Sequence, residues 1–269
     1  MRVPASSANL GPGFDGIAMA LSLYATVREA EKGDVVADEF HPASIAFRAL
    51  GGTGDISVRT DIPMGRGLGY SGAVRVGGAL LATVQQDASA LLSPQWRQKV
   101  LVATAGLEGH GDNVAASLLG GVVGTNGTFA ANIMNNCAVE VVVWVPSEST
   151  STHASRTKLP SQVSLADAAF NISHTALLVG ALNSGDLEAL GVATADRLHQ
   201  DIRFAAVPQS KAALDAGLNA GAICGWLSGS GPSVAMFCRA GEAARIAQSL
   251  PAQGSAKVLN IDTAGARLL

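Results

Sequence analysis

A glycine-rich segment at residues 63–73 (PMGRGLGYSGA) limits what this chain can fold into more than any other feature. Residues 55–60 before it alternate between apolar and polar side chains like a short strand, and residues 73–86 after it read as a helix. Glycine lets the backbone adopt positive φ and approach a ligand closely, and successive N–H groups in such a turn attract anions. Because the following helix adds the positive end of its dipole, the segment predicts a phosphate-binding turn.

A glycine-rich turn that binds no ligand is the alternative interpretation of a single motif of this kind. The segment matches neither GxxxxGK[ST] nor a GxGxxG followed by an acidic residue about twenty positions later, so neither a P-loop nor a dinucleotide-binding fold is predicted. Ser71 supplies a hydroxyl near the expected start of the helix, where it would reach a phosphate or a bound Mg²⁺.

Strand and helix patterns are mixed along the rest of the chain without a regular βαβ period, which predicts an α+β fold rather than a doubly wound one. An apolar stretch that alternates with small residues covers residues 3–31, and Val139–Val145 is a strong strand pattern. Leu165–Ser184 is expected to form a long buried helix. Further helices are expected at residues 94–106, 113–119, from about 186, 209–220 and 243–250, and further strands at residues 222–227, 234–238 and 258–262.

Composition excludes several classes of protein. The net charge is −3 and there is no basic tract, so nucleic-acid binding is not predicted. No run of eighteen apolar residues occurs and the N-terminus does not resemble a signal peptide, so neither a membrane span nor export is expected. The three cysteines form no CxxC pair, which favours a reduced cytoplasmic location without a structural metal.

Two further motifs combine small residues, tight turns and polar side chains. Residues 4–15 (PASSANLGPGFD) include Asn9, whose amide can donate and accept hydrogen bonds, and Asp15, whose carboxylate suits an ammonium group. Residues 227–233 (LSGSGPS) form a second turn with closely spaced backbone donors.

In their order along the chain, residues 4–15, 63–73 and 227–233 resemble the three motifs of the GHMP kinase family. The resemblance implies an N-terminal ATP-binding domain of the ribosomal protein S5 domain 2-like type at residues 1–136 and a ferredoxin-like C-terminal domain at residues 137–269. It also implies ATP and Mg²⁺, with the acceptor between the first and third motifs. The residues expected to bind ATP are Pro63, Met64, Gly65, Arg66, Gly67, Leu68, Gly69, Tyr70, Ser71, Gly72 and Ala73.

Three other stretches are similar to the homoserine kinases within that family. Residues 108–115 (EGHGDNVA) resemble EGHPDNVAP, residues 152–160 (THASRTKLP) resemble TxxARxxLP, and residues 196–203 (DRLHQDIR) resemble the DR[LI]HxPYR pattern. The likeness implies phosphorylation of the hydroxyl of L-homoserine in threonine biosynthesis, and a homodimer is expected.

The homoserine kinase resemblance also implies a role for each matching residue. Asp15 would bind the substrate ammonium and Arg156 and Arg203 its carboxylate, because an arginine fork pairs with a carboxylate through two hydrogen bonds. The other pocket-lining residues would be Asn9, His110 and Asn113, with Asn113 and Arg156 taking part in catalysis and Ser71 and Glu108 as candidate Mg²⁺ ligands.

Other interpretations stay open at this point. Tyr70 replaces the first serine of the usual GLGSSGA pattern, so a non-catalytic ligand-binding member of the family is one alternative. A kinase for another small alcohol, such as mevalonate, pantoate or shikimate, is a second. Outside the motifs, Arg156 and Arg203 would be read as solvated surface groups, His110 as a structural histidine and Asn113 as a helix N-cap.

Overall fold

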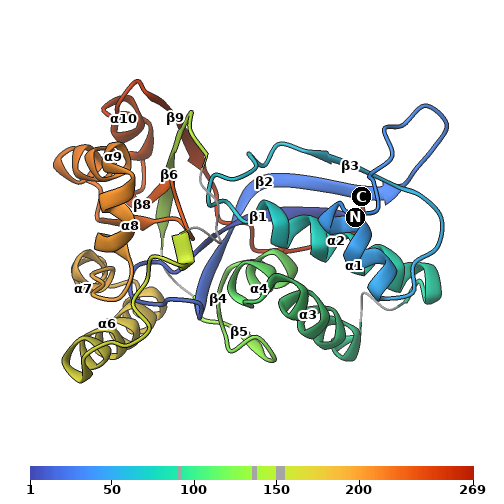
Figure 1. Ribbon diagram of the computed structural model, residues 1–269. Helices are drawn as coiled ribbons and strands as arrows, with labels where there is room; N and C mark the ends of the chain where they lie inside the picture. Colours follow the sequence, from blue (N-terminus) through green and yellow to red (C-terminus); the bar gives the residue numbers. More distant parts are fainter. Residues whose placement is uncertain (90–92, 135–137, 150–154) are drawn as a thin grey trace.

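The computed structural model describes residues 1–89, 93–134, 138–149 and 155–269 and contains two antiparallel sheets, each with its own helices (Figure 1). This arrangement confirms the expected α+β class. The strands are β1 (Arg2–Ala8), β2 (Ile17–Glu29), β3 (Ile56–Thr60), β4 (Val122–Thr125), β5 (Ala130–Asn132), β6 (Val139–Pro146), β7 (Cys224–Leu227), β8 (Val234–Arg239) and β9 (Gly254–Leu259). The helices are α1 (Pro42–Ala49), α2 (Tyr70–Gln86), α3 (Pro94–Glu108), α4 (Asp112–Leu119), α6 (Leu165–Ser184), α7 (Leu187–Ala193), α8 (Gln200–Ala206), α9 (Pro208–Asn219) and α10 (Ala243–Gln248).

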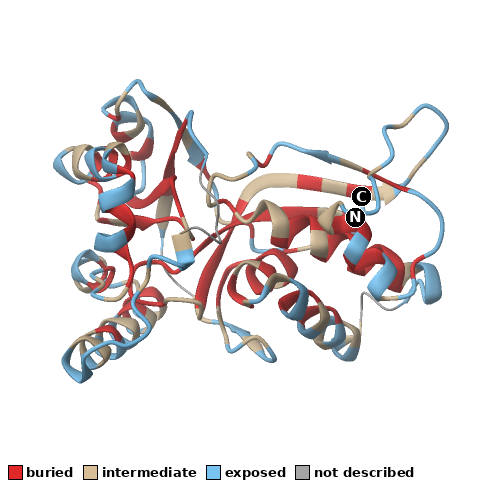
Figure 2. Ribbon diagram, in the orientation of Figure 1, coloured by how far each residue is buried: buried red, intermediate tan, exposed pale blue. Residues whose placement is uncertain are grey.

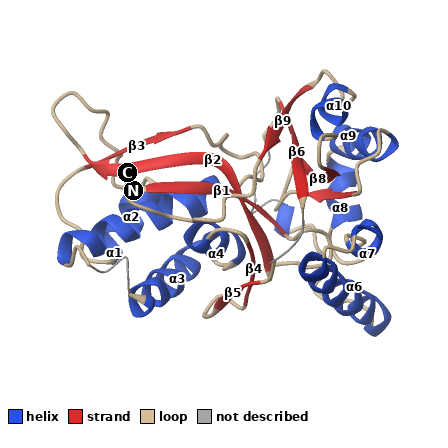
Figure 3. Cartoon of the chain, turned by 180° about the vertical axis from the view of Figure 1, so that it is seen from behind, coloured by secondary structure: helices blue, strands red, loops and turns tan. Residues whose placement is uncertain are grey.

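The first sheet is organised around the 13-residue strand β2. Its start pairs with β4, its end pairs with β3, and β1 runs along it over nearly its whole length. Helices α1 to α4 gather along the same side of this sheet (Figure 3). Small residues bring α2 very close to its neighbours: a Cβ at Gly77 would lie 2.5 Å from the side chain of Val27, and one at Gly78 would lie 2.1 Å from the carbonyl oxygen of Ala43.

The second sheet has the strand order β7-β8-β6-β9. The apolar pattern of β6 explains its central place, because its residues from Val141 to Val145 are all buried. Helices α8, α9 and α10 pack beside this sheet around a second apolar cluster that includes Trp144, Leu227 and Met236.

After β9 the chain returns to the first sheet. Arg267 pairs with Arg2 on β1, and the buried carboxylate of Asp262 accepts a hydrogen bond from the hydroxyl of Tyr24 at 2.9 Å. The two chain ends therefore lie side by side (Figure 1). The predicted division between residues 136 and 137 lies outside the described residues, as do residues 152–154 of the second homoserine kinase-like stretch.

Several predicted elements differ from the structure. Helix α2 begins at Tyr70, three residues before the expected start, and the last strand occupies Gly254–Leu259 rather than residues 258–262. Short elements that the patterns did not predict are α1, α8, β4 and β5.

The prediction that α6 is buried was wrong. Figure 2 shows it largely exposed or half-buried, and Leu165 and Ile172 are 86% and 70% exposed. Although no membrane span was expected, α6 is the one helix among the described residues that is long and apolar enough to cross a membrane by length and composition alone. Apolar composition predicts burial of a helix only when one of its faces has a partner.

Candidate active site

The glycine-rich turn is held between the first and third motifs. Gly65, Gly67 and Gly69 all have positive φ. A Cβ at Gly67 would lie 2.2 Å from the carbonyl oxygen of Ser228, and one at Gly69 would lie 2.0 Å from Ser6 Oγ. Leu68 between them is 1% exposed and its carbonyl accepts a hydrogen bond from the backbone N–H of Ser6. Only a chain without Cβ atoms at Gly67 and Gly69 fits this space, so the turn has a fixed shape.

Helix α2 starts at the pocket without a side-chain cap. Its N-cap is Gly69, which has no side chain to bond the first N–H groups of the helix. These donors and the helix dipole favour an anion at this end. Arg66, which precedes them in the turn, points away: its guanidinium donates to the carbonyl oxygens of Pro146 and Ser147 at the end of β6.

Asn9 connects the first motif (residues 4–15) to the third (residues 227–233) through a hydrogen bond. It has a φ of 76° and is 2% exposed. Its Nδ2 donates to the carbonyl of Gly229 at 2.9 Å, and its Oδ1 accepts from the backbone N–H of Asp15 at 3.1 Å. Asn9 lines the pocket as predicted, yet both ends of its amide already bond to the backbone. Its observed contacts are therefore structural ones.

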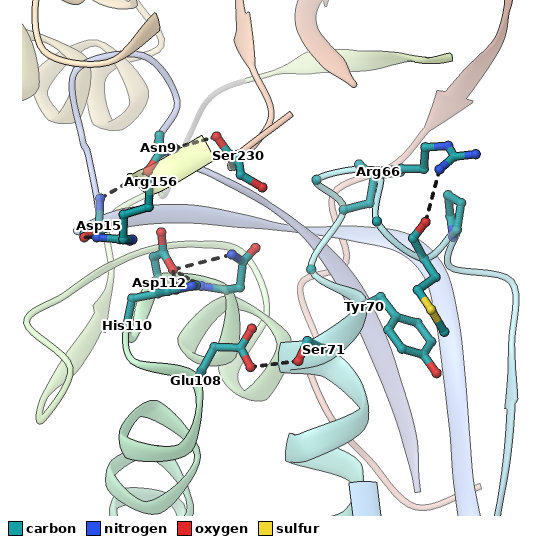
Figure 4. Close-up of a pocket in the computed structure, with 18 of the residues that line it drawn as sticks. Asn9, Asp15, Arg66, Tyr70, Ser71, Glu108, His110, Asp112, Arg156 and Ser230 are labelled. Carbon is teal, nitrogen blue, oxygen red and sulfur yellow. Dashed lines mark hydrogen bonds and ion pairs between the residues drawn. The ribbon is translucent and has the colours of Figure 1, made fainter. Parts of the chain in front are cut away.

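Asp15 and Arg156 form a bidentate ion pair across the mouth of the pocket (Figure 4). Arg156 Nη1 donates to Asp15 Oδ2 at 2.8 Å, and Nη2 donates to Oδ1 at 2.7 Å. The pair is partly exposed, with 41% of the Arg156 side chain and 34% of the Asp15 side chain accessible. The hydrogen bond to Asp15 raises the pKa of Arg156 further above its usual value.

Arg203 lies deeper and is 5% exposed. Its Nη1 lies 3.0 Å from the carbonyl of Gly229 and 3.2 Å from Nδ1 of His199, while its buried Nε has no hydrogen-bond partner among the described residues. Burial lowers the pKa of Arg203, and the charge of Arg156 adds to this effect. A buried guanidinium next to a pocket is ready to pair with an anion, because its own desolvation is then compensated.

His110, Asp112 and Asn113 form a hydrogen-bonded chain at the start of α4. Asp112 is 2% exposed, and its Oδ1 lies 2.7 Å from His110 Nδ1 and accepts the backbone N–H of Asn113 at 2.7 Å. Asn113 Oδ1 accepts from Ser6 Oγ at 2.8 Å. Burial is the largest influence on the pKa of His110 and lowers it, but the hydrogen bond and charge of Asp112, together with Glu108 and Asp15, outweigh it and raise the pKa.

Ser71 and Glu108 meet on the other side of the pocket (Figure 4). Ser71 Oγ donates to Glu108 Oε2 at 2.9 Å. Tyr70 turns away from this pair, and its hydroxyl lies 3.0 Å from Nε2 of His41, the N-cap residue of α1. The ring of Tyr70 therefore packs beside α1 and leaves the start of α2 open.

These residues surround about 720 Å³ of space, a volume that includes the open mouth of the pocket. The predicted residues that line it are Asn9, Asp15, the turn from Pro63 to Ser71, Glu108, His110, Asn113, Arg156 and Arg203. Gly72 and Ala73, also predicted to bind ATP, are buried within the first turn of α2.

Two family profiles match the chain: one described as GHMP kinases N terminal domain, at residues 34–121, and one described as GHMP kinases C terminal, at residues 178–256. A protein named homoserine kinase from Desulfitobacterium hafniense is 37% identical over an alignment that covers 100% of this chain and 99% of that protein. The chain belongs to the GHMP kinase family. A homoserine kinase from Thermus thermophilus is also 37% identical, over 97% of this chain and 95% of that protein.

Solved structures share the fold of this chain. A homoserine kinase from Cytophaga hutchinsonii shares the fold with a TM-score of 0.83 at 23% identity, covering 98% of this chain and 95% of that one. A putative homoserine kinase from Listeria monocytogenes has a TM-score of 0.80 at 27% identity, covering 98% and 96%. The GHMP kinase fold expected from the three motifs is therefore confirmed.

Three site residues of this GHMP kinase were missed by the sequence interpretation. Ser6 contacts both Gly69 and Asn113, Asp112 holds His110 and Asn113, and Arg75 bonds Ser71 and Glu108. Ser6 and Asp112 lie inside residues 4–15 and 108–115, two stretches already identified as motifs, so their position indicated that they belong to the site. Arg75 offered another signal, because it is a lone charge within the apolar stretch of α2.

Proposed function

We propose that this GHMP kinase transfers the γ-phosphoryl group of ATP to the terminal hydroxyl of L-homoserine, giving O-phospho-L-homoserine. The observation that carries the proposal is the Asp15–Arg156 pair, which places one negative and one positive group at the mouth of a pocket whose other end is the phosphate-binding turn. The two relatives described above, both named homoserine kinase, support the same acceptor.

Homoserine would be recognised by exchange of this ion pair. Its ammonium replaces Arg156 as the partner of Asp15, while its carboxylate takes the guanidinium of Arg156 together with that of Arg203. Mevalonate, pantoate and shikimate carry a carboxylate but no ammonium. They would separate the pair and leave Asp15 without a partner, which costs free energy in a partly buried site.

Phosphoryl transfer in this site would depend on positioning. The acceptor oxygen attacks the γ-phosphorus while the bond to the bridging oxygen of ADP breaks and the hydroxyl proton passes to an oxygen of the transferred phosphoryl group, with charge spread over the equatorial oxygens. The N-terminus of α2 would stabilise that charge, Asn113 would orient the hydroxyl, and Arg156 would contact the transferred group. Asp112 would not act as a base, because it is buried and already hydrogen-bonded to His110 and Asn113.

Mg²⁺ would be held by Ser71 and Glu108 together with the nucleotide. Their two oxygens lie 2.9 Å apart, and Mg²⁺ prefers oxygen ligands and shares them with phosphates and water. Across the described ranges, no three His, Cys, Asp or Glu side chains gather into a metal site of their own. When bound, the ion would neutralise charge on the phosphates.

The test is ADP release in the presence of Mg²⁺ with a panel of amino and hydroxy acids. We expect L-homoserine to give a higher kcat/KM than mevalonate, pantoate or shikimate. Absence of ADP above background with homoserine, alongside turnover of another alcohol, would show that the acceptor is wrong. The homodimer, the division into domains at residues 1–136 and 137–269, and the cytoplasmic location are further predictions from the resemblance.

A further inference from the structure

The guanidinium of Arg75 contacts the side-chain oxygens of Ser71 and Glu108, the two proposed Mg²⁺ ligands. Arg75 follows Ser71 by four residues on α2, so both side chains are on the same face of the helix. Arg75 Nη1 lies 2.8 Å from Glu108 Oε2 and also donates to Ser71 Oγ. Ser71 in turn donates to that same carboxylate oxygen. The three groups therefore form a closed triangle in which Glu108 is already neutralised.

The surroundings of Arg75 are unusual for a charged residue. Only 15% of its side chain and 13% of that of Glu108 are exposed. Its neighbours Val74 and Val76 are fully buried, and its Nε is buried without a hydrogen-bond partner among the described residues. Burial of a guanidinium with an unsatisfied N–H costs free energy, which the bond to Glu108 offsets only in part. Packing of α2 alone does not explain an arginine at this position.

We propose that Arg75 is a built-in competitor of the divalent cation, which keeps free metal out of the site until nucleotide arrives. A guanidinium and a divalent cation repel each other and need the same lone pairs of Ser71 and Glu108, so the two cannot share the triangle. Free metal gains too few ligands to displace Arg75. Metal that arrives with a triphosphate brings phosphate oxygens as further ligands. The inference rests on the proposed nucleotide function only in this last step.

Arg75 is a positioning residue whose role does not depend on the acceptor. In the free protein Arg75 holds Glu108 and Ser71 at the pocket and prevents the carboxylate from recruiting an adventitious cation. With nucleotide present, the triangle opens, and Glu108 becomes available to the metal. Without Arg75, the carboxylate of Glu108 would keep the hydrogen bond from Ser71 but would have no positive partner, and a free cation would fill that place.

The experiment is a titration of nucleotide-free protein with Mn²⁺, followed by the electron paramagnetic resonance signal of the unbound ion. Arg75→Met keeps the length of the side chain and removes its charge, and Arg75→Gln is a second neutral variant. We expect both to bind Mn²⁺ at least tenfold more tightly than wild type, whereas Arg75→Lys should bind as weakly as wild type. Adding Glu108→Gln to Arg75→Met should abolish the gain.

Thermal melting supplies a second measurement on the same proteins. Mn²⁺ should raise the Tm of Arg75→Met and leave that of wild type unchanged, because only the variant has a free carboxylate. Equal Mn²⁺ affinity in wild type and both neutral variants would overturn the proposal, as would a gain that persists without Glu108. None of these measurements uses phosphoryl transfer, so a protein that fails to phosphorylate homoserine would still give a clear answer about Arg75.

Discussion

At the level of single residues, Asp15 and Arg156 neutralise each other before any substrate is present. Replacement of Asp15 by Asn keeps the shape of the side chain and removes the charge that would bind the homoserine ammonium in the proposed function. We expect kcat/KM for homoserine to fall by an amount equivalent to about 1.5–3 kcal/mol of transition-state stabilisation, since that is the usual contribution of a hydrogen bond to a charged group. The matched measurement uses 4-hydroxybutanoate, which has the carboxylate and hydroxyl but no ammonium. An equal fall in kcat/KM for both acceptors would show that Asp15 does not recognise the ammonium group.

His110 offers a test by pH. Its pKa is raised in the folded protein, mainly because Asp112 offsets the effect of burial. The charged His110–Asp112 pair therefore stabilises the fold fully below the usual histidine value of about 6.5 and loses that contribution as the pH rises through the raised pKa. His110→Gln should lower the Tm most at pH below that value and progressively less above it. A Tm difference that does not change with pH would contradict the assignment.

At the level of elements, the shape of the glycine-rich turn is the feature that a small substitution should disturb most. In Gly69→Ala the new Cβ would lie 2.0 Å from Ser6 Oγ at a φ of 67°, so the turn must shift. We expect ATP binding to weaken at least tenfold, with a loss of about 1–3 kcal/mol in unfolding free energy from the strained conformation. Gly106→Ala on α3 is the control, because nothing lies within 4 Å of its Cβ position. Calorimetric ATP affinity equal to wild type in both variants would exclude a nucleotide role for the turn.

Tyr70 is the one departure from the usual turn sequence that the structure explains. Its hydroxyl bonds His41 and its ring meets the imidazole edge-on at a centroid distance of 6.3 Å. This contact ties the start of α2 to the start of α1 and leaves Ser71 free to face Glu108. Tyr70→Ser should therefore keep kcat/KM within a few-fold while lowering the Tm. A loss of activity well beyond that, at unchanged Tm, would mean that Tyr70 contacts the nucleotide.

These elements also show how far the sequence could predict the site. The turn at residues 63–73 and the helices after it follow from local rules about glycine and periodicity, so their place was predictable. The contacts of Ser6 with Gly69 and of Arg75 with Glu108 depend on how distant segments meet, which no local pattern contains. For the same reason, the apolar pattern of residues 165–184 predicted the length of α6 correctly but predicted its burial wrongly.

At the level of the whole molecule, the site exists because three segments far apart in the chain converge. The first motif supplies Asp15, the glycine-rich turn leads into the uncapped start of α2, and the third motif is hydrogen-bonded to both through Asn9 and Ser228. Resemblance predicted this convergence, because the order of the motifs is typical of the GHMP kinase family. The pairing of Asp15 with Arg156, in contrast, came only from the structure.

Identification of the phosphorylated product tests the central claim most directly. Purified protein with ATP, Mg²⁺ and L-homoserine should give a phosphomonoester signal in ³¹P NMR that grows in step with ADP and matches authentic O-phospho-L-homoserine. Omission of homoserine should abolish both signals. Formation of ADP and inorganic phosphate alone, or a phosphomonoester only with an acceptor that lacks an ammonium group, would contradict the account.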